Sequence, residues 1–105
     1  MKKIAVLVTT GSKKEAESIA RGLVEKKLAA CVNIIPSIKS IYAWKGRIEA
    51  SEEYLLIAKT RESLFSRVEK AVKSLHSYEC PEITALPLTK GSAGYMRWIE
   101  ESTRR

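Results

Sequence analysis

Two long extended segments, joined at Lys45-Gly46, constrain the fold of this chain more than any other feature. Residues 30–44 and 47–59 both have an extended pattern, and each is far longer than the usual strand of about five or six residues. The glycine at the junction can take the positive φ that a tight turn requires. The pattern therefore predicts a long β-hairpin at the centre of the chain.

The outer half of this hairpin carries more apolar surface than two ordinary helices can cover. Its large side chains are Ile38, Ile41, Tyr42, Trp44 and Ile48. Leaving them in water forfeits several kcal/mol at about 25 cal/mol per Å² of apolar area, and an isolated two-stranded ribbon is marginal in water. We expect neighbouring copies of the chain to cover the hairpin in a closed cyclic oligomer, which leaves no open strand edge. The alternative is a ribbon that bends at Pro36 and folds back on its own sheet.

The remaining segments alternate between strand and helix patterns. Residues 2–10 are apolar on both faces, which is typical of a central strand, and Ser12 with Glu15 is a predicted capping box. The helix that follows has an apolar stripe of Ala16, Ile19, Ala20, Leu23, Val24 and Leu28. Thr60 is the predicted cap of a second helix, whose stripe is Leu64, Phe65, Val68, Ala71, Val72 and Leu75. Residues 83–88 form a short strand that Pro87 places at a sheet edge, and Ser92 opens a terminal helix.

This order predicts an α+β fold of the ferredoxin-like β-α-β-β-α-β plan, followed by a C-terminal helix. The sheet is expected to be antiparallel, with two helices on one face and a long central hairpin. Because 105 residues is the size of one domain, residues 1–105 are interpreted as a single domain.

The net charge of +7 raises the question of a nucleic-acid partner. Lysine and arginine are scattered in short pairs, however, and residues 54–57 lack the aromatic motif on which an RNA-binding sheet stacks bases. No apolar run approaches the roughly 18–20 residues that span a bilayer. We therefore expect neither a nucleic-acid nor a membrane partner.

A cytoplasmic location is predicted from the first residues and from the cysteines. The apolar stretch at residues 4–8 breaks at residues 9–12, and no signal-peptide cleavage site follows, so it is interpreted as a buried strand. Cys31 and Cys80 are too few for a disulfide framework in a chain of this length, so both thiols are expected to be reduced.

The loop at residues 76–80 is a candidate metal site. His76 is the single histidine of the chain and Cys80 follows four residues later; an imidazole and a thiolate suit copper or zinc. Cys31 is a candidate third ligand if the fold brings it near. No cofactor is certain, and a divalent metal ion, copper first, is the candidate. In the alternative interpretation, His76 caps the preceding helix or bonds within the loop, and both cysteines are small buried hydrophobes.

A second group of side chains is expected at a pocket or interface between subunits: Trp44, Lys59, Tyr78, Glu79, Glu82, Tyr95 and Trp98. The lysine and the glutamates suit acid–base chemistry or an anionic ligand, or else they form interface ion pairs. Because no pairing of a nucleophile with a base is evident, we do not expect an enzyme.

Four segments resemble the signatures of the CutA divalent-cation-tolerance family. They are residues 27–36, residues 40–49 with Glu53 and Lys59-Thr60, residues 75–83, and residues 95–99. The resemblance spans essentially the whole chain. It implies a ferredoxin-like subunit in a tight homotrimer, similar in architecture to the PII signalling proteins, and a link to divalent-cation tolerance, with copper binding associated with some members.

The chain departs from the family pattern around the loop. Ser77 replaces a proline, and Cys80 takes the position of a β-branched residue. Thr9 and Leu75 stand where some copper-associated members carry a cysteine and a second histidine. The resemblance thus implies a homotrimer that responds to divalent metal ions with weak binding of copper or another divalent cation. The alternatives are a PII-like signalling trimer that binds a small anionic metabolite between subunits, and a structural trimer that anchors partners.

Overall fold

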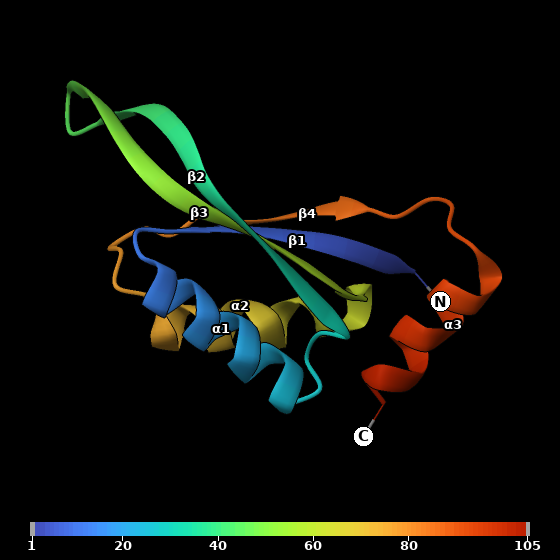
Figure 1. The fold of residues 1–105 in the computed structure, drawn as a ribbon. Helices are drawn as coiled ribbons and strands as arrows, with labels where there is room; N and C mark the ends of the chain where they lie inside the picture. The colour runs from blue at the N-terminus through green and yellow to red at the C-terminus, as the bar shows by residue number, and fades with distance from the viewer. Residues whose placement is uncertain (1, 105) are drawn as a thin grey trace.

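The computed structural model describes residues 2–104 and contains four strands and three α-helices in that range. In chain order these are β1 (Lys3–Thr10), α1 (Lys13–Glu25), β2 (Cys31–Trp44), β3 (Arg47–Arg61), α2 (Phe65–Leu75), β4 (Ile83–Pro87) and α3 (Ala93–Ser102), with a short 3-10 helix at Glu62–Leu64 before α2. The strands form one antiparallel sheet in the order β2-β3-β1-β4 (Figure 1). The ferredoxin-like prediction is confirmed.

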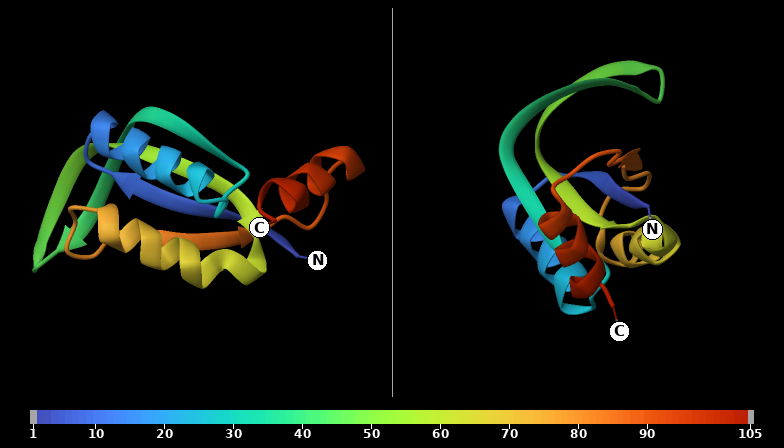
Figure 2. Two further views of the ribbon diagram at one scale, coloured as in Figure 1. Left: turned by 90° about the horizontal axis from the view of Figure 1, so that it is seen from below. Right: turned by 90° about the vertical axis from the view of Figure 1, so that its right-hand side faces the viewer.

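Helices α1 and α2 lie side by side on one face of the sheet, and the core fills the space between (Figures 1 and 2). Its fully buried members include Val6, Val8, Ile19, Leu23, Val68 and Val72. Helix α3 lies at one end of the sheet, near the start of β1. There Lys3 Nζ is 3.0 Å from Glu100 Oε1, and Arg61 donates to Thr103 from Nε, over 2.9 Å, so the terminal helix is fastened to both central strands.

The opposite face of the sheet is covered by none of the helices in residues 2–104. Strand alternation and register place five large apolar side chains on it: Leu7, Ile35, Leu55, Ile57 and Leu86. We call these residues the open face. Ile35 is 41% exposed and Leu86 54% exposed, so the apolar surface of this face is in contact with solvent within one subunit.

The predicted hairpin is present and protrudes from the sheet (Figure 1). Strands β2 and β3 contain 14 and 15 residues, and Lys45 and Gly46 turn between them with φ of 50° and 78°. Positive φ at both positions is the signature of a type I′ turn, which matches the twist of paired strands. Ile41 and Ile48, in the outer half, are 71% and 78% exposed.

The ribbon also bends. The register shifts between Ile35 and Ile38, where Ser37 takes a φ of 59°, which forms a bulge beside Pro36. Beyond the bulge the ribbon arches away from the sheet (Figure 2). Because Ile41 and Ile48 stay exposed, the bend does not by itself bury the outer apolar side chains.

Local details differ from the sequence expectations in two places. Thr60 does not cap α2: it is fully buried in β3, where its hydroxyl donates to the Leu28 carbonyl over 2.6 Å, and the 3-10 helix intervenes before α2 begins. Val24 and Leu75 are 43% and 41% exposed instead of buried, since each lies in the last turn of its helix. Strand β4 pairs only with β1 and ends at Pro87, which confirms its edge position.

Candidate functional site

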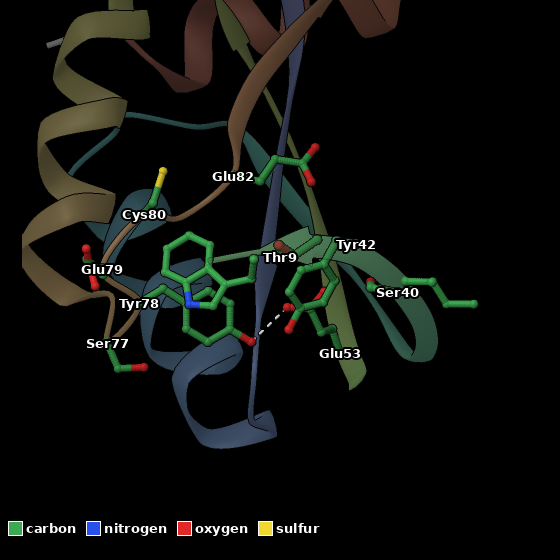
Figure 3. A pocket seen from close by; sticks show the side chains of 11 residues that line it. Thr9, Ser40, Tyr42, Glu53, Ser77, Tyr78, Glu79, Cys80 and Glu82 are labelled. Atoms are coloured by element: carbon green, nitrogen blue, oxygen red, sulfur yellow. Dashed lines mark hydrogen bonds between the residues drawn. The ribbon is translucent and has the colours of Figure 1, made fainter. Parts of the chain in front are cut away.

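A cavity of about 740 Å³ opens between the outer half of the hairpin and the loop that precedes β4 (Figure 3). We call it the ribbon cavity. The hairpin contributes Tyr42, Trp44 and Glu53 to its wall, the loop contributes Tyr78, Glu79, Cys80 and Glu82, and the end of β1 contributes Thr9. The cavity therefore combines aromatic rings with carboxylates and one thiol.

His76 anchors the loop to the end of β1. Its side chain is fully buried, with Nε2 2.6 Å from the Thr9 carbonyl oxygen and Nδ1 3.1 Å from the Tyr78 amide nitrogen. A carbonyl can only accept and an amide N–H can only donate, so Nε2 carries the proton and Nδ1 accepts. Both ring nitrogens are thus occupied by bonds to the protein backbone. This arrangement suits a structural histidine, and neither nitrogen is available to a metal without breaking a bond.

Glu15 ties the same loop to the start of α1. Ser12 accepts from the Glu15 amide over 3.1 Å, as a capping serine should, but the Glu15 carboxylate does not return to Ser12. Its Oε2 instead accepts from the Ser77 amide over 2.9 Å, and its Oε1 lies 3.6 Å from His76 Nδ1. The reciprocal half of the predicted capping box is therefore wrong, because the loop presents an amide that the carboxylate bonds instead.

Tyr78 and Glu53 form a part-buried hydrogen bond in the wall of the cavity. The Tyr78 hydroxyl donates to Glu53 Oε2 over 2.7 Å, and Glu53 is only 6% exposed (Figure 3). Burial, and then the neighbouring carboxylate, raise the pKa of Tyr78 well above its usual value, so this phenol remains a donor. A Cβ on Gly11 would lie 2.9 Å from the Tyr78 oxygen, which explains why a residue without a side chain occupies that position.

Glu53 is the site residue that our sequence reasoning missed. It belongs to an acidic patch with Glu49 and Glu52, and composition does not distinguish the three. Strand alternation separates only Glu52, which points to the other face and is exposed, because Glu49 and Glu53 both share the parity of Leu55 on the open face. What distinguishes Glu53 from Glu49 is its hydrogen bond to Tyr78, a tertiary contact that the sequence does not show.

The candidate metal ligands do not converge within one chain. Cys31 pairs with Lys59, which pairs with Ala5. His76 instead bonds Thr9, which is four residues from Ala5 along β1. At about 3.3 Å per residue, Thr9 is therefore roughly 13 Å from the part of the sheet that holds Cys31. Cys80 is exposed. In residues 2–104 no three side chains among His, Cys, Asp and Glu are grouped closely enough to hold a metal ion. The residues present therefore do not form a preorganised metal centre.

The predicted interface residues separate into two groups. Trp44, Tyr78, Glu79 and Glu82 all line the ribbon cavity. The other three lie toward the opposite end of the sheet: the Lys59 ammonium hydrogen-bonds Asn33 Oδ1, and the Tyr95 and Trp98 rings are 5.5 Å apart on α3. Burial and the neighbouring Cys31 raise the pKa of Tyr95. Lys59 is therefore too far along the sheet to act with Glu79 or Glu82 of its own chain.

The tip of the hairpin reaches the loop across the mouth of the cavity. Lys45 Nζ lies 3.7 Å from Glu79 Oε1 and 5.6 Å from the centre of the Trp44 ring. Both charged side chains are exposed, so this pair contributes little stability, on the order of 0–1 kcal/mol. Its position nevertheless shows that the tip of the hairpin and the loop are close enough for one bound molecule to contact both.

Comparison with known proteins identifies the relatives of the chain. A sequence model of the CutA1 divalent ion tolerance protein matches residues 4–102. The divalent-cation tolerance protein CutA of Thermus thermophilus is 46% identical over 98 residues, which cover 93% of this chain and 95% of that protein. The chloroplastic protein CutA of Arabidopsis thaliana is 45% identical over 101 residues, 96% of this chain, and the chain spans 56% of the length of that relative.

The solved structures agree with this result. One described as the periplasmic divalent cation tolerance protein CutA from Archaeoglobus fulgidus superposes with a TM-score of 0.94 at 46% identity, over 97% of this chain and 99% of that one. The two proteins are therefore similar in sequence as well as in fold.

The same relatives correct the predicted cytoplasmic location. One is described as periplasmic and another as chloroplastic, so relatives with a similar sequence are located outside the cytoplasm. The prediction was wrong because a buried first strand is a property of the fold and carries no information about the compartment. Among the helices within residues 2–104, none combines the length and the apolar character that a bilayer crossing requires.

Proposed function

The chain belongs to the CutA1 divalent ion tolerance family, and we propose that it acts in divalent-cation tolerance as a homotrimer of single-domain subunits, without enzymatic activity. The observation that carries the assembly is the open face together with the outer hairpin. Both carry large apolar side chains that remain exposed to solvent in the described part of the chain.

A second copy of the chain is the occupant that best fits these surfaces. Burying Ile35, Leu86, Ile41 and Ile48 against identical subunits removes apolar area from water without requiring any other protein. Two strand edges, β2 and β4, are also open in one subunit, and closed symmetry satisfies such edges. Three subunits are what the family resemblance implies, and cyclic closure is consistent with that number.

Direct binding of divalent ions is, in this proposal, weak. Copper or another divalent ion would meet the Cys80 thiol and the nearby carboxylates Glu79 and Glu82, all of which are exposed at the ribbon cavity. His76 would contribute by holding the loop in place, since both of its nitrogens are already bonded. Cys31 would act as a further ligand of the ion only if it came from a different subunit.

Sedimentation of the full chain at micromolar concentration tests the assembly. We expect a species of three subunits, and we expect Leu86→Glu to dissociate it because a charge would be buried in the interface. Val24→Glu is the matched control, because Val24 lies on the helical side of the subunit and its exposed fraction, 43%, is similar to the 54% of Leu86. A folded single-subunit species in the unsubstituted protein, or a Leu86→Glu variant that remains trimeric, would contradict the proposal.

Calorimetric titration of the metal-free protein with Cu²⁺ tests the metal contact. Weak binding that decreases in Cys80→Ser and persists in a folded His76→Gln variant is the expected result. Tight binding that depends on His76 would instead assign the loop imidazole as a ligand. The alternative of an anionic metabolite finds no support in the ribbon cavity, where the described lining includes three carboxylates and neither lysine nor arginine.

A further inference from the structure

Two different partners lie beside one ring nitrogen of His76. Its Nδ1 accepts from the Tyr78 amide over 3.1 Å, and Glu15 Oε1 lies 3.6 Å from the same nitrogen. An unprotonated ring nitrogen can accept from an amide, whereas a protonated one can only donate. The Tyr78 amide therefore suits the neutral ring, and the Glu15 carboxylate suits the charged ring.

All the partners of the ring belong to the same chain. Strand β1 supplies the Thr9 carbonyl, which accepts from Nε2 over 2.6 Å, helix α1 supplies Glu15, and the loop supplies the Tyr78 amide. His76 itself is the residue that ends α2, and its side chain is 0% exposed. Because the ring is buried inside one subunit, these contacts do not depend on which outer surfaces neighbouring copies cover.

The charges around the ring favour its protonated form. Glu15 is the one acidic side chain within ion-pair distance of the imidazole in residues 2–104, and the C-terminal end of α2 also attracts positive charge. Lys73, in the last turn of α2, is paired with Glu69 over 3.1 Å. Tyr78 places its ring 4.7 Å from the imidazole centre, and the Glu53 carboxylate acts on the imidazole only through the Tyr78 hydroxyl. These surroundings offset part of the cost of burying a charged ring.

A second proton on the ring would force an exchange of partners. The new N–H on Nδ1 would face the N–H of the Tyr78 amide, and two donors cannot bond each other. The nearest acceptor for the new N–H is Glu15 Oε1, and Glu15 Oε2 already accepts from the Ser77 amide over 2.9 Å. The bond from Nε2 to the Thr9 carbonyl needs no change, because Nε2 carries a proton in both forms.

We propose that His76 is a pH-sensitive latch of the loop at residues 76–80: when the ring takes a second proton, it exchanges the Tyr78 amide for the Glu15 carboxylate and releases the loop at Tyr78. Histidine is the side chain suited to such a change near neutral pH. Because the Tyr78 hydroxyl bonds Glu53, the release is transmitted to the hairpin. The inference goes beyond the proposed function, because neither self-assembly nor metal tolerance requires a loop that responds to pH.

Nuclear magnetic resonance of the metal-free, full-length protein between about pH 8 and pH 5 tests the latch. The chain has one histidine, so a single set of imidazole signals reports its protonation. We expect the proton on Nε2 at the upper pH and on both nitrogens at the lower pH. The protection of the Tyr78 amide against hydrogen exchange, corrected for the intrinsic rate at each pH, should fall about fivefold or more with the same midpoint.

Three variants separate the latch from a general effect of acid. His76→Gln keeps an acceptor and a donor but takes no proton, so the protection of the Tyr78 amide should not change with pH. Glu15→Gln still accepts from Ser77 but loses its charge, and it should weaken proton binding by the ring about tenfold. Glu17→Gln is the matched control: Glu17 is exposed on the same helix and lines a groove beside β2, so the change should be less than about twofold.

Four results would overturn the inference. They are a ring that stays neutral until the chain unfolds, constant protection of the Tyr78 amide while the ring titrates, the same pH dependence in His76→Gln, and equal titration midpoints in Glu15→Gln and Glu17→Gln. If His76→Gln does not fold, the two glutamate variants still decide the question. Sedimentation of the same samples separates the latch from the assembly: a trimer in which Tyr78 protection stays constant refutes only the latch.

Discussion

The inner and outer halves of the β2–β3 ribbon belong to the same two strands but are stabilised differently. In the inner half, Leu56 and Ala58 face the helices and are 0% and 1% exposed. In the outer half, beyond the bulge, Ile41 and Ile48 are 71% and 78% exposed although strand pairing continues to the turn. Strand pairing therefore continues along the outer ribbon, while these two large apolar side chains beyond the bulge are not buried within one chain.

This contrast indicates what each half contributes. The inner half stabilises the subunit, and the outer half supplies surface, both for neighbouring copies and for the ribbon cavity. The difference can be tested by comparing matched substitutions on the two sides of the bulge.

The largest expected effect is at Leu56. Leu56→Ala removes a fully buried side chain and should lower the free energy of unfolding by about 2–5 kcal/mol, whereas Ile48→Ala should change the stability of a lone subunit by less than about 0.5 kcal/mol. Urea unfolding followed by circular dichroism measures both. If Ile48 is buried between copies, its loss should appear mainly as a melting temperature that falls with dilution. If Leu56→Ala and Ile48→Ala lost equal stability at every protein concentration, the two halves of the ribbon would not be stabilised differently.

A smaller effect is expected at the turn. Gly46 has a φ of 78°, so Gly46→Ala places a side chain in the left-handed region and should cost about 1 kcal/mol. Gly94→Ala is the control, because Gly94 lies in α3 with open space around it and alanine favours a helix by about 0.5–1 kcal/mol. Thermal melts should thus shift in opposite directions. An unchanged melting temperature in the Gly46→Ala variant would mean that the turn accepts a side chain without strain.

The smallest effect concerns Glu100 of α3, and it is lost at acidic pH. The hydrogen bond and charge of Lys3 lower the pKa of Glu100, despite some opposing burial. A lowered folded-state pKa means that the ionised carboxylate stabilises the fold above its unfolded pKa of about 4.3, and that this contribution is lost as the pH falls toward the folded value. Melting temperatures of the unsubstituted protein and Glu100→Gln should differ at pH 7 and converge as the pH falls below 4. A constant difference across that range would exclude this linkage.

Much of the fold could be predicted from the sequence because its signals are local. The Lys45-Gly46 turn, the alternation of the strands and the spacing of three and four in the helices each depend on near neighbours, and the structure follows them. Thr60 shows where such reasoning fails. A threonine ahead of a helical pattern is a reasonable cap, but its hydroxyl bonds the Leu28 carbonyl, a residue distant in sequence.

The site was less predictable for the same reason. His76, Tyr78 and Cys80 were recognised as chemically important, but the bonds of His76 to Thr9 and to Tyr78 depend on how the loop meets the end of β1. Glu53 resembles its acidic neighbours until the parity of the strand and the position of Tyr78 are both known. Residue type predicted the candidates, and only tertiary contacts assign their roles.

The bulge at Pro36 and Ser37 sets the direction in which the outer ribbon leaves the sheet. Strand pairing is interrupted there and is continuous on both sides, so the segment from Ile38 to the turn projects as one paired unit. The fixed φ of proline restricts the backbone conformations open to the bulge. Because Lys45 at the tip lies beside Glu79 of the loop, the angle set at the bulge determines how wide the mouth of the ribbon cavity is.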